Sequence, residues 1–245
     1  MSGTEVSSEA ASAVPPDVDA LFFDVFGTLV DWRSSIARDA PPIIGREVDG
    51  LAFADAWRAE YQVGMEGVRA GSRGYVRLDI LHRENLDRIL PRFGLDDLGE
   101  RERTELNLVW HRLDAWPDVE FGLSRLRRRF RLAPCSNGNI ALMVDLARHN
   151  AFTWDAILGA EIARDYKPKP VVYLAAADAL GLAPERCMMV AAHSYDLSAA
   201  AECGLRTAHL ARSDEYGPGT GESVSTVPVD VAVGSLTELA ERLGA

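Results

Sequence analysis

Six short apolar runs recur along this chain, and helical patterns separate most of them. The runs cover residues 18–24, 132–136, 156–160, 187–193, 206–211 and 229–233. The helical patterns cover residues 140–149, 170–180, 196–203 and 236–243. Strands that are buried on both faces have continuous apolar sequences rather than alternating ones. The alternation therefore predicts an α/β fold, in which helices cover both faces of a doubly wound parallel sheet.

A long insertion follows the first apolar run. Between residues 24 and 132 the sequence shows no convincing strand, and this is far too long for a simple strand-to-helix connection. Helical composition covers three stretches, 51–68, 76–90 and 101–116. We expect residues 34–116 to form a helical cap domain on a core made of residues 18–33 and 117–245. Ligands of open α/β sheets bind outside the carboxyl ends of the strands, so such a cap would roof an active site.

Composition excludes several classes of partner. A net charge of -11 disfavours binding to nucleic acid, which needs a basic face. Residues 1–17 are rich in Ser, Ala and Pro and lack the features of a signal peptide, which predicts a disordered tail. No apolar run approaches the roughly 20 residues of a membrane span. The three cysteines show no C-x-x-C spacing and suit a reducing compartment, so we expect a cytoplasmic protein.

Chemically active side chains stand at four predicted strand ends. They are Asp24 with Thr28 in the turn after it, Ser136 with Asn137, Lys167, and Asp196. Each of these residues could instead have a purely structural role: an aspartate can cap a helix, Ser-Asn-Gly can form a turn, and Lys-Pro can begin a helix. Together they would bring a carboxylate nucleophile, hydroxyl and amide donors, an ammonium group and a second acid to one edge of the sheet.

The four elements, in this order, resemble the four sequence motifs of the haloacid dehalogenase superfamily. The resemblance spans residues 18–212 and implies a Rossmann-like core, a mobile cap and ester chemistry at Asp24. Phosphatases of the superfamily carry a second aspartate two residues after the nucleophile, where this chain has Phe26. They also hold magnesium with an acidic pair in the fourth motif, where this chain offers Asp196 alone. We therefore expect neither a metal ion nor another cofactor.

The chain is most similar to the L-2-haloacid dehalogenase branch. An aromatic residue at Phe26 is typical of that branch, and Trp57-Arg58 begins a W-R-x-x-Q-like segment in the predicted cap. Tyr173 stands six residues after Lys167, as in that family. The fourth motif departs from the family, because His193 occupies the place of an amide. Its ring could donate to a halide, orient the hydrolytic water or merely pack.

The resemblance implies hydrolysis of small anionic 2-haloalkanoic acids, namely haloacetates and L-2-halopropionates, with fluoroacetate as a further candidate. Asp24 would displace the halide to give an aspartyl ester, which water would then hydrolyse, with Asp196 as the base or as the group that orients the water. The expected catalytic residues are Asp24, Thr28, Arg58, Ser136, Lys167 and Asp196. The expected substrate-binding residues are Val25, Phe26, Trp57, Asn137, Tyr173 and His193. The family resemblance also suggests a homodimer.

Two other functions stay open at this point. A phosphatase or phosphonatase of the same superfamily would release phosphate with magnesium. A binding protein could keep the fold without turnover, although the intact charged residues Asp24, Lys167 and Asp196 disfavour that reading.

Overall fold

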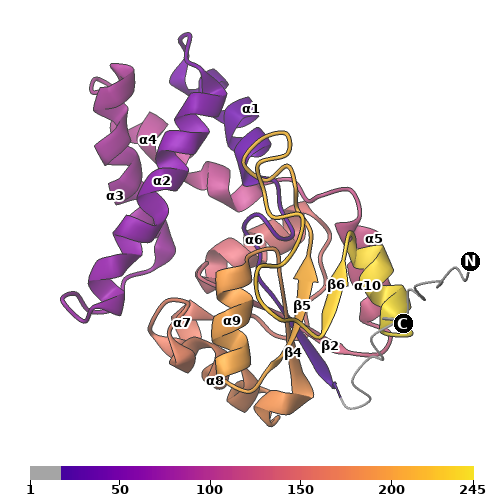
Figure 1. Ribbon diagram of the computed structural model, residues 1–245. Coiled ribbons are helices and arrows are strands. Elements are labelled where there is room, and N and C mark those ends of the chain that lie inside the picture. Colours follow the sequence, from indigo (N-terminus) through magenta and orange to yellow (C-terminus); the bar gives the residue numbers. More distant parts are fainter. Residues whose placement is uncertain (1–17) are drawn as a thin grey trace, which may run out of the picture.

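The computed structural model describes residues 18–245 (Figure 1), so the tail predicted for residues 1–17 lies outside the described residues. In the described part, six parallel strands form one sheet in the order β3-β2-β1-β4-β5-β6. The strands are β1 Ala20–Phe23, β2 Arg131–Ser136, β3 Leu158–Gly159, β4 Cys187–Ala191, β5 Arg206–Leu210 and β6 Val231–Val233. Each overlaps one of the apolar runs, which confirms the predicted α/β class.

Strand β1 lies at the centre of the sheet and is completely buried. Its side chains alternate between the two faces, so Leu21 and Phe23 join one core cluster and Ala20 and Phe22 join the other. The first cluster includes residues of α5 Val119–Leu126, α6 Ile140–His149 and α10 Leu236–Arg242. The second includes residues of α8 Pro170–Ala179 and α9 Ser194–Glu202. Both faces are therefore covered, as the continuous apolar runs require.

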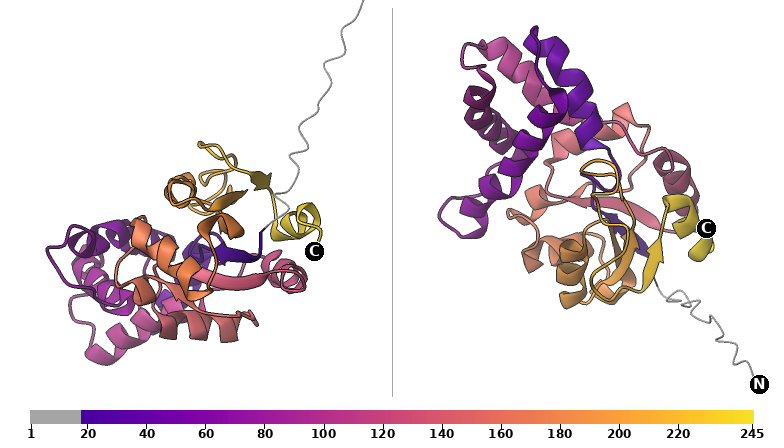
Figure 2. Two further views of the ribbon diagram at one scale, coloured as in Figure 1. Left: turned by 90° about the horizontal axis from the view of Figure 1, so that it is seen from below. Right: turned by 45° about the horizontal axis from the view of Figure 1, so that its top comes forward.

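The long insertion is helical. It contains α1 Trp32–Ile44, α2 Gly50–Arg69, α3 Leu78–Ile89 and α4 Glu100–Asn107, with 3-10 turns η1 Leu90–Phe93 and η2 Leu108–Arg112. Both views in Figure 2 show these helices grouped at one end of the molecule. Two short elements complete the fold, α7 Ala160–Ala163 and η3 Pro184–Arg186. None of the helices in residues 18–245 has the length and apolar character needed to cross a membrane.

Two details of the insertion differ from the sequence-based expectation. Helix α1 was not among the predicted helices, and its second half contains Pro41 and Pro42. Pro41 cannot donate to the carbonyl of Ala37, and Gly50 lies against that carbonyl so closely that a Cβ would be 2.3 Å from the oxygen. The predicted helix over residues 101–116 is wrong in its second half. There the chain tightens into η2 and then extends, so that Ala115 pairs with Val30.

The segments that enter and leave the insertion run side by side. The Asp31 amide donates to the Asp114 carbonyl at 2.9 Å, and the Trp116 amide donates to the Leu29 carbonyl at 3.0 Å. Elsewhere the insertion contacts the loop after β3, where Arg69 donates to the Lys167 carbonyl at 3.2 Å. Its helices thus lie close to the edge of the sheet at which the strands end.

We predict that Gly159→Ala destabilises the fold. Gly159 has φ +111°, and a Cβ there would be 2.3 Å from the Ser136 carbonyl oxygen of β2. The free energy of unfolding in urea should fall by more than about 2 kcal/mol, because backbone strain and a backbone clash add. The matched control is Gly181→Ala, at φ +65° with no neighbouring atom within 4 Å, where only the local strain applies. Equal losses in the two variants would contradict the assigned packing of β3 on β2.

Candidate active site

Asp24 directly follows β1 and is anchored to the neighbouring strand, since its amide donates to the Val190 carbonyl at 3.0 Å. Its carboxylate Oδ1 accepts a hydrogen bond from Lys167 Nζ at 2.8 Å. Oδ2 accepts one from Thr28 Oγ1 at 2.7 Å, and this hydroxyl in turn accepts from the Ala192 amide at 2.9 Å. The turn after β1 therefore fixes the orientation of the carboxylate, as a reacting group requires.

Lys167 joins two carboxylates at adjacent strand ends. Its ammonium group, 3% exposed, lies 2.8 Å from Asp24 Oδ1 and 2.5 Å from Asp196 Oδ2. Its amide donates to Asn137 Oδ1 at 2.8 Å, which ties the loop after β3 to the loop after β2. Burial alone would lower the pKa of Lys167, but the two carboxylates raise it well above its usual value. The ammonium ion is a fixed charge of the site.

Both oxygens of Asp196 are engaged. Oδ2 accepts from Lys167, and Oδ1 accepts from the Tyr173 hydroxyl at 2.5 Å. Burial raises the pKa of Asp196, and the nearby charge of Asp24 acts in the same direction against the attraction of Lys167. The side chains of Asp196 and Tyr173 are buried, and Tyr173 holds Asp196 in its contact with Lys167.

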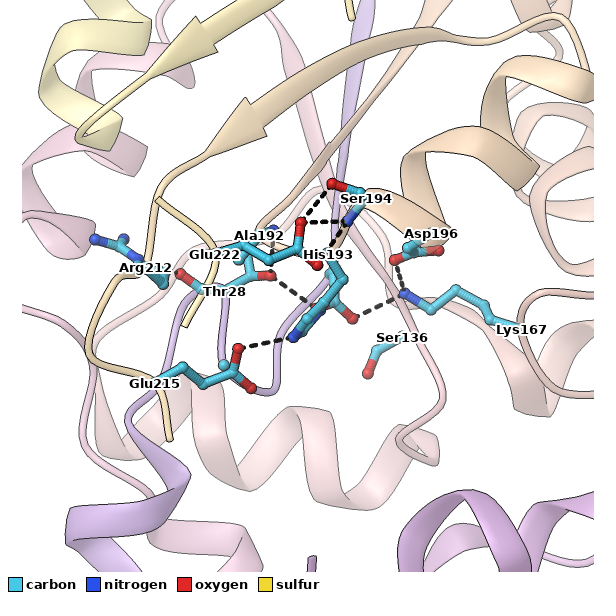
Figure 3. Close-up of polar contacts among 12 residues, drawn as sticks. Thr28, Ser136, Lys167, Ala192, His193, Ser194, Asp196, Arg212, Glu215 and Glu222 are labelled. Atoms are coloured by element: carbon cyan, nitrogen blue, oxygen red, sulfur yellow. Dashed lines mark hydrogen bonds and ion pairs between the residues drawn. The ribbon is translucent and has the colours of Figure 1, made fainter. Parts of the chain in front are cut away.

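His193 lies between two carboxylates. Its Nδ1 is 3.2 Å from Asp24 Oδ2, and its Nε2 is 2.8 Å from Glu215 Oε2. Figure 3 shows Glu215 and Lys167 on opposite sides of the His193 ring. Glu215, 1% exposed, also accepts from Trp32 Nε1 at 3.0 Å. A Cβ at Gly27 would be 2.0 Å from Glu215 Oε1, so the glycine leaves the space that this carboxylate occupies.

The charges of this group reinforce one another. Burial by itself would lower the pKa of His193, but hydrogen bonds and charge from Asp24 and Glu215 raise it to about 10. Burial would raise the pKa of Asp24, yet Lys167 and His193 outweigh it and hold that pKa well below its usual value. Burial would also raise the pKa of Glu215, but the hydrogen bond and the charge of His193 outweigh it and lower that pKa. The site thus holds an ionised Asp24 between an ammonium and an imidazolium ion.

Glu215 was missed by the sequence analysis. It lies in the connection between β5 and β6, where no periodic pattern marks a residue as buried. Hydrogen bonds near both ends hold this connection. Arg212 donates to the Thr28 carbonyl at 2.8 Å and pairs with Asp118, while Glu222 accepts from the amide and the hydroxyl of Ser194 (Figure 3). Hydrogen bonds of Arg212 and Glu222 therefore anchor the β5–β6 connection on both sides of Glu215.

Arg58 approaches from α2. Its guanidinium carbon lies 4.2 Å from the ring centre of Tyr61 and 5.3 Å from that of Trp32. Its Nη2 is 3.9 Å from Glu215 Oε1. Tyr61, also missed by the sequence analysis, is buried close enough to Asp24 and Asn137 for both to affect the pKa of its hydroxyl, which burial raises. The insertion therefore contributes a cation and an aromatic ring to the site.

The remaining predicted residues differ in their placement. The Ser136 hydroxyl is buried and accepts from the Gly138 amide at 3.0 Å. The Val25 carbonyl accepts from two amides of the turn, and the Phe26 ring packs inside the insertion. Trp57 contacts the rings of Phe53 and Trp110, and its indole N–H donates to the His82 carbonyl at 2.9 Å. Both the ring and the N–H group of Trp57 thus have partners within the insertion.

A cavity of about 550 Å³ lies beside these charged groups. It is lined by Trp32, Asp55, Arg58, Ala59, Tyr61, Gln62, Tyr195 and Tyr216. Tyr195, which is 48% exposed, has its ring 5.6 Å from that of His193. The cavity therefore reaches Arg58, and Tyr195 separates it from the His193 ring. Among residues 18–245, no group of three or more His, Cys, Asp and Glu side chains is arranged to hold a metal ion.

Comparison with known proteins identifies similar chains. The family model for haloacid dehalogenase-like hydrolases matches residues 18–204. (S)-2-haloacid dehalogenase 4A of Burkholderia cepacia is 29% identical, over 90% of this chain and 92% of its own. The crystal structure of a defluorinating L-2-haloacid dehalogenase is 44% identical with a TM-score of 0.90, over 93% of this chain and 96% of that one. A second L-2-haloacid dehalogenase structure is 41% identical with a TM-score of 0.89, over 93% and 99%. These similarities confirm the family that the four motifs indicated.

We predict that the His193 ring titrates near pH 10 in NMR spectra of the folded protein. Glu215→Gln and Asp24→Asn should each lower this pKa, since each removes one of the two carboxylates. A pKa raised from 6.5 to about 10 means that the ion pairs stabilise the fold fully below pH 6.5 and lose this effect as the pH rises toward 10. His111 is the control, because its pKa is raised against burial by Asp79 and Asp145, and it should not respond to either variant. An unchanged His193 titration in Glu215→Gln would refute the proposed pairing.

Proposed function

Since the chain belongs to the haloacid dehalogenase-like hydrolases, in their L-2-haloacid dehalogenase branch, we propose that it hydrolyses the carbon-halogen bond of small (S)-2-haloalkanoic acids. The substrates would be haloacetates and L-2-halopropionates, and the products a 2-hydroxy acid and a halide ion. One observation carries this proposal: the buried Asp24 carboxylate lies at the end of β1, where Thr28 orients it and Lys167 and His193 keep it ionised. We take residues 34–116 to be the cap domain.

In the first step, Asp24 attacks the carbon that bears the halogen. An oxygen-carbon bond forms, the carbon-halogen bond breaks, and its electron pair leaves with the halide, so the carbon is inverted. Burial with only two fixed cations keeps the carboxylate nucleophilic, because little water has to be removed before reaction. Arg58 stabilises the charge that develops on the halide, together with Asn137. Ser136, Lys167 and the amides of the turn after Asp24 hold the substrate carboxylate.

In the second step, water hydrolyses the Asp24 ester, and we assign the base to His193 rather than Asp196. Both oxygens of Asp196 are occupied by Lys167 and Tyr173 at 2.5 Å, which leaves Asp196 as a support for Lys167. His193 adjoins the reacting carboxylate through Nδ1 and is held by Glu215 through Nε2. The role expected for Asp196 therefore passes to His193, for which contact with the substrate and orientation of the hydrolytic water were both expected possibilities.

The change of charge at Asp24 would switch His193 between its two states. In the free enzyme the Asp24 carboxylate keeps the ring protonated. Ester formation removes that negative charge, so the pKa of His193 falls and its proton passes to solvent. The neutral ring then takes a proton from the attacking water, and the second water proton ends on the hydroxyl of the product. Recovery of the Asp24 carboxylate restores the ion pair, and one proton is released per turnover.

The phosphatase alternative requires an acid at the position of Phe26. The Phe26 ring instead packs edge-on against Trp110, with ring centres 5.6 Å apart, and cannot transfer a proton to a leaving alcohol. A homodimer stays a prediction from the resemblance, and a cytoplasmic location stays a prediction from the cysteine pattern.

We predict that Asp24→Asn abolishes chloride release from L-2-chloropropionate, by about a thousandfold or more, because the nucleophile is lost. Chloride and acid release are measured with EDTA present, which should leave the unmodified protein fully active. Mass spectrometry of acid-quenched protein should show the ester on Asp24 only where that carboxylate is intact. Thermal unfolding is the control for folding. Near-normal chloride release by the variant, or a loss with EDTA that magnesium restores, would remove the proposal.

We predict that His193→Gln and Glu215→Gln accumulate the Asp24 ester. Removal of a general base should slow ester hydrolysis by about a hundredfold or more, while chloride release in a single turnover changes far less. In the unmodified protein, ester hydrolysis should accelerate as the pH rises, because the neutral ring is the active form, and His193→Gln should lose this dependence. If Asp196→Asn accumulates the ester and His193→Gln does not, the base is Asp196 after all.

A further inference from the structure

The first turn of α3, in the insertion, is bonded to the start of α6, in the core. The Asp79 amide donates to Asn139 Oδ1 at 3.2 Å, and Asn139 Nδ2 donates to Asp79 Oδ2 at 2.8 Å. Beside them, Arg77 donates to Glu161 at 2.9 Å, and Glu161 accepts from the Ile140 amide at 2.7 Å. The insertion is thus joined to the core at the point where α6 begins.

His111 of η2 adds a second contact with α6. Its Nε2 lies 3.0 Å from Asp79 Oδ1, and its Nδ1 lies 2.8 Å from Asp145 Oδ2. Asn139 directly precedes α6 and Asp145 lies within it. The contacts therefore run from α6 through α3 and η2 and return to α6. We call these four residues the α6 clamp: Asp79, His111, Asn139 and Asp145.

The start of α6 follows the loop that carries two residues of the candidate site. Asn139, 1% exposed, is separated from Asn137 by Gly138 alone. Asn137 Oδ1 accepts from the Lys167 amide at 2.8 Å, and Ser136 Oγ accepts from the Gly138 amide at 3.0 Å. A displacement of Asn139 would therefore move Asn137 and Ser136. A misplacement of about 1 Å at a reacting site can cost about a hundredfold in rate.

The α6 clamp needs a protonated His111. A neutral imidazole has one N–H and can donate to only one of the two carboxylates, whereas an imidazolium ion donates to both. Burial by itself would lower the pKa of His111, but hydrogen bonds and charge from Asp79 and Asp145 raise it. The charged state is therefore the one that the surrounding groups favour.

The other groups around His111 do not compete for its proton. His82 of α3 is neutral, because burial lowers its pKa to about 3. Toward α1, the neighbouring Arg112 pairs with Asp39 at 3.4 Å. Asn107, at the end of α4, is uncharged and donates to the backbone of α3 at 2.9 Å. The two carboxylates of the α6 clamp therefore set the charge of His111.

We propose that Asp79 and His111 are positioning residues for the reaction, which fasten the insertion to α6 and thereby keep Ser136 and Asn137 in place against the substrate. This inference rests on the proposed function, because the positioned residues are the ones assigned to the substrate and the halide. Loss of the His111 proton loosens the α6 clamp. Ester formation should therefore slow as the pH rises, whereas ester hydrolysis accelerates through His193.

The α6 clamp can be observed without any substrate. The Asp79 amide lies in the first turn of α3 and is bonded to Asn139 Oδ1, so its hydrogen exchange, followed by NMR, reports this contact. At a pH below the pKa of His111, His111→Gln and Asp145→Asn should each speed up this exchange about tenfold, which corresponds to about 1.4 kcal/mol.

Glu84→Gln is the matched control. Glu84 also lies on α3, but it accepts two hydrogen bonds from Arg73, at 2.7 and 2.8 Å, within the insertion. Exchange of the Asp79 amide should be unchanged in this variant. Equal acceleration in Glu84→Gln and His111→Gln, or no acceleration in any variant, would refute the α6 clamp.

Single-turnover kinetics with L-2-chloropropionate supply the second measurement. At a pH below the pKa of His111, His111→Gln should slow formation of the Asp24 ester about tenfold. In the unmodified protein, this rate should fall as the pH rises through the raised pKa of His111. Asp145→Asn should move the fall to lower pH, and Asp145→Glu, which restores the charge, should move it back.

The two measurements separate the possible failures. If ester formation is unchanged in His111→Gln while amide exchange accelerates, the contact is structural only and the positioning role is refuted. A fall at the same pH in Asp145→Asn as in the unmodified protein would also refute it. If amide exchange responds as expected but no ester forms in the unmodified protein, the proposed function fails and the α6 clamp itself still stands.

Discussion

The site depends on one ammonium group held between two carboxylates at adjacent strand ends. Asp24 and Asp196 follow β1 and β4, which pair in parallel, so their side chains lie at the same edge of the sheet. Two buried carboxylates this close would repel each other and one would take up a proton. Lys167 prevents this, and Asn137 and Tyr173 hold Lys167 and Asp196 in place. Such a buried ion network adds little net stability, so its value lies in keeping Asp24 charged.

The sequence was informative where the backbone is regular. The apolar runs predicted all six strands of the described part because parallel strands are buried on both faces, and the strand ends then brought Asp24, Lys167 and Asp196 together. Glu215 and Tyr61 could not be predicted. Glu215 belongs to a connection without periodicity, and Tyr61 follows a helical pattern that is the same for packing and for function.

His193 shows what a sequence leaves open. The sequence indicated a titratable ring near Asp24 but could not show its second partner, so a structural role and a chemical role both stayed open. The contact of 2.8 Å from Nε2 to Glu215 orients the ring and raises its pKa, and it supports the chemical role that we propose. For Trp57 the substrate contact stays a prediction, and its ring packs on Trp110 while its N–H donates to the His82 carbonyl.

In the proposed mechanism, the connection between β5 and β6 lets the two steps of the reaction be altered separately. The proposed nucleophile Asp24 and its partner Lys167 follow strands of the sheet, where a change disturbs the sheet. Glu215 is supplied by a segment outside the sheet that is tied down at Arg212 and Glu222. Evolution or an engineer can therefore exchange the residues between these two anchors and adjust how fast the intermediate is cleared. Asp24 and Lys167, which we propose to form the intermediate, would be unchanged.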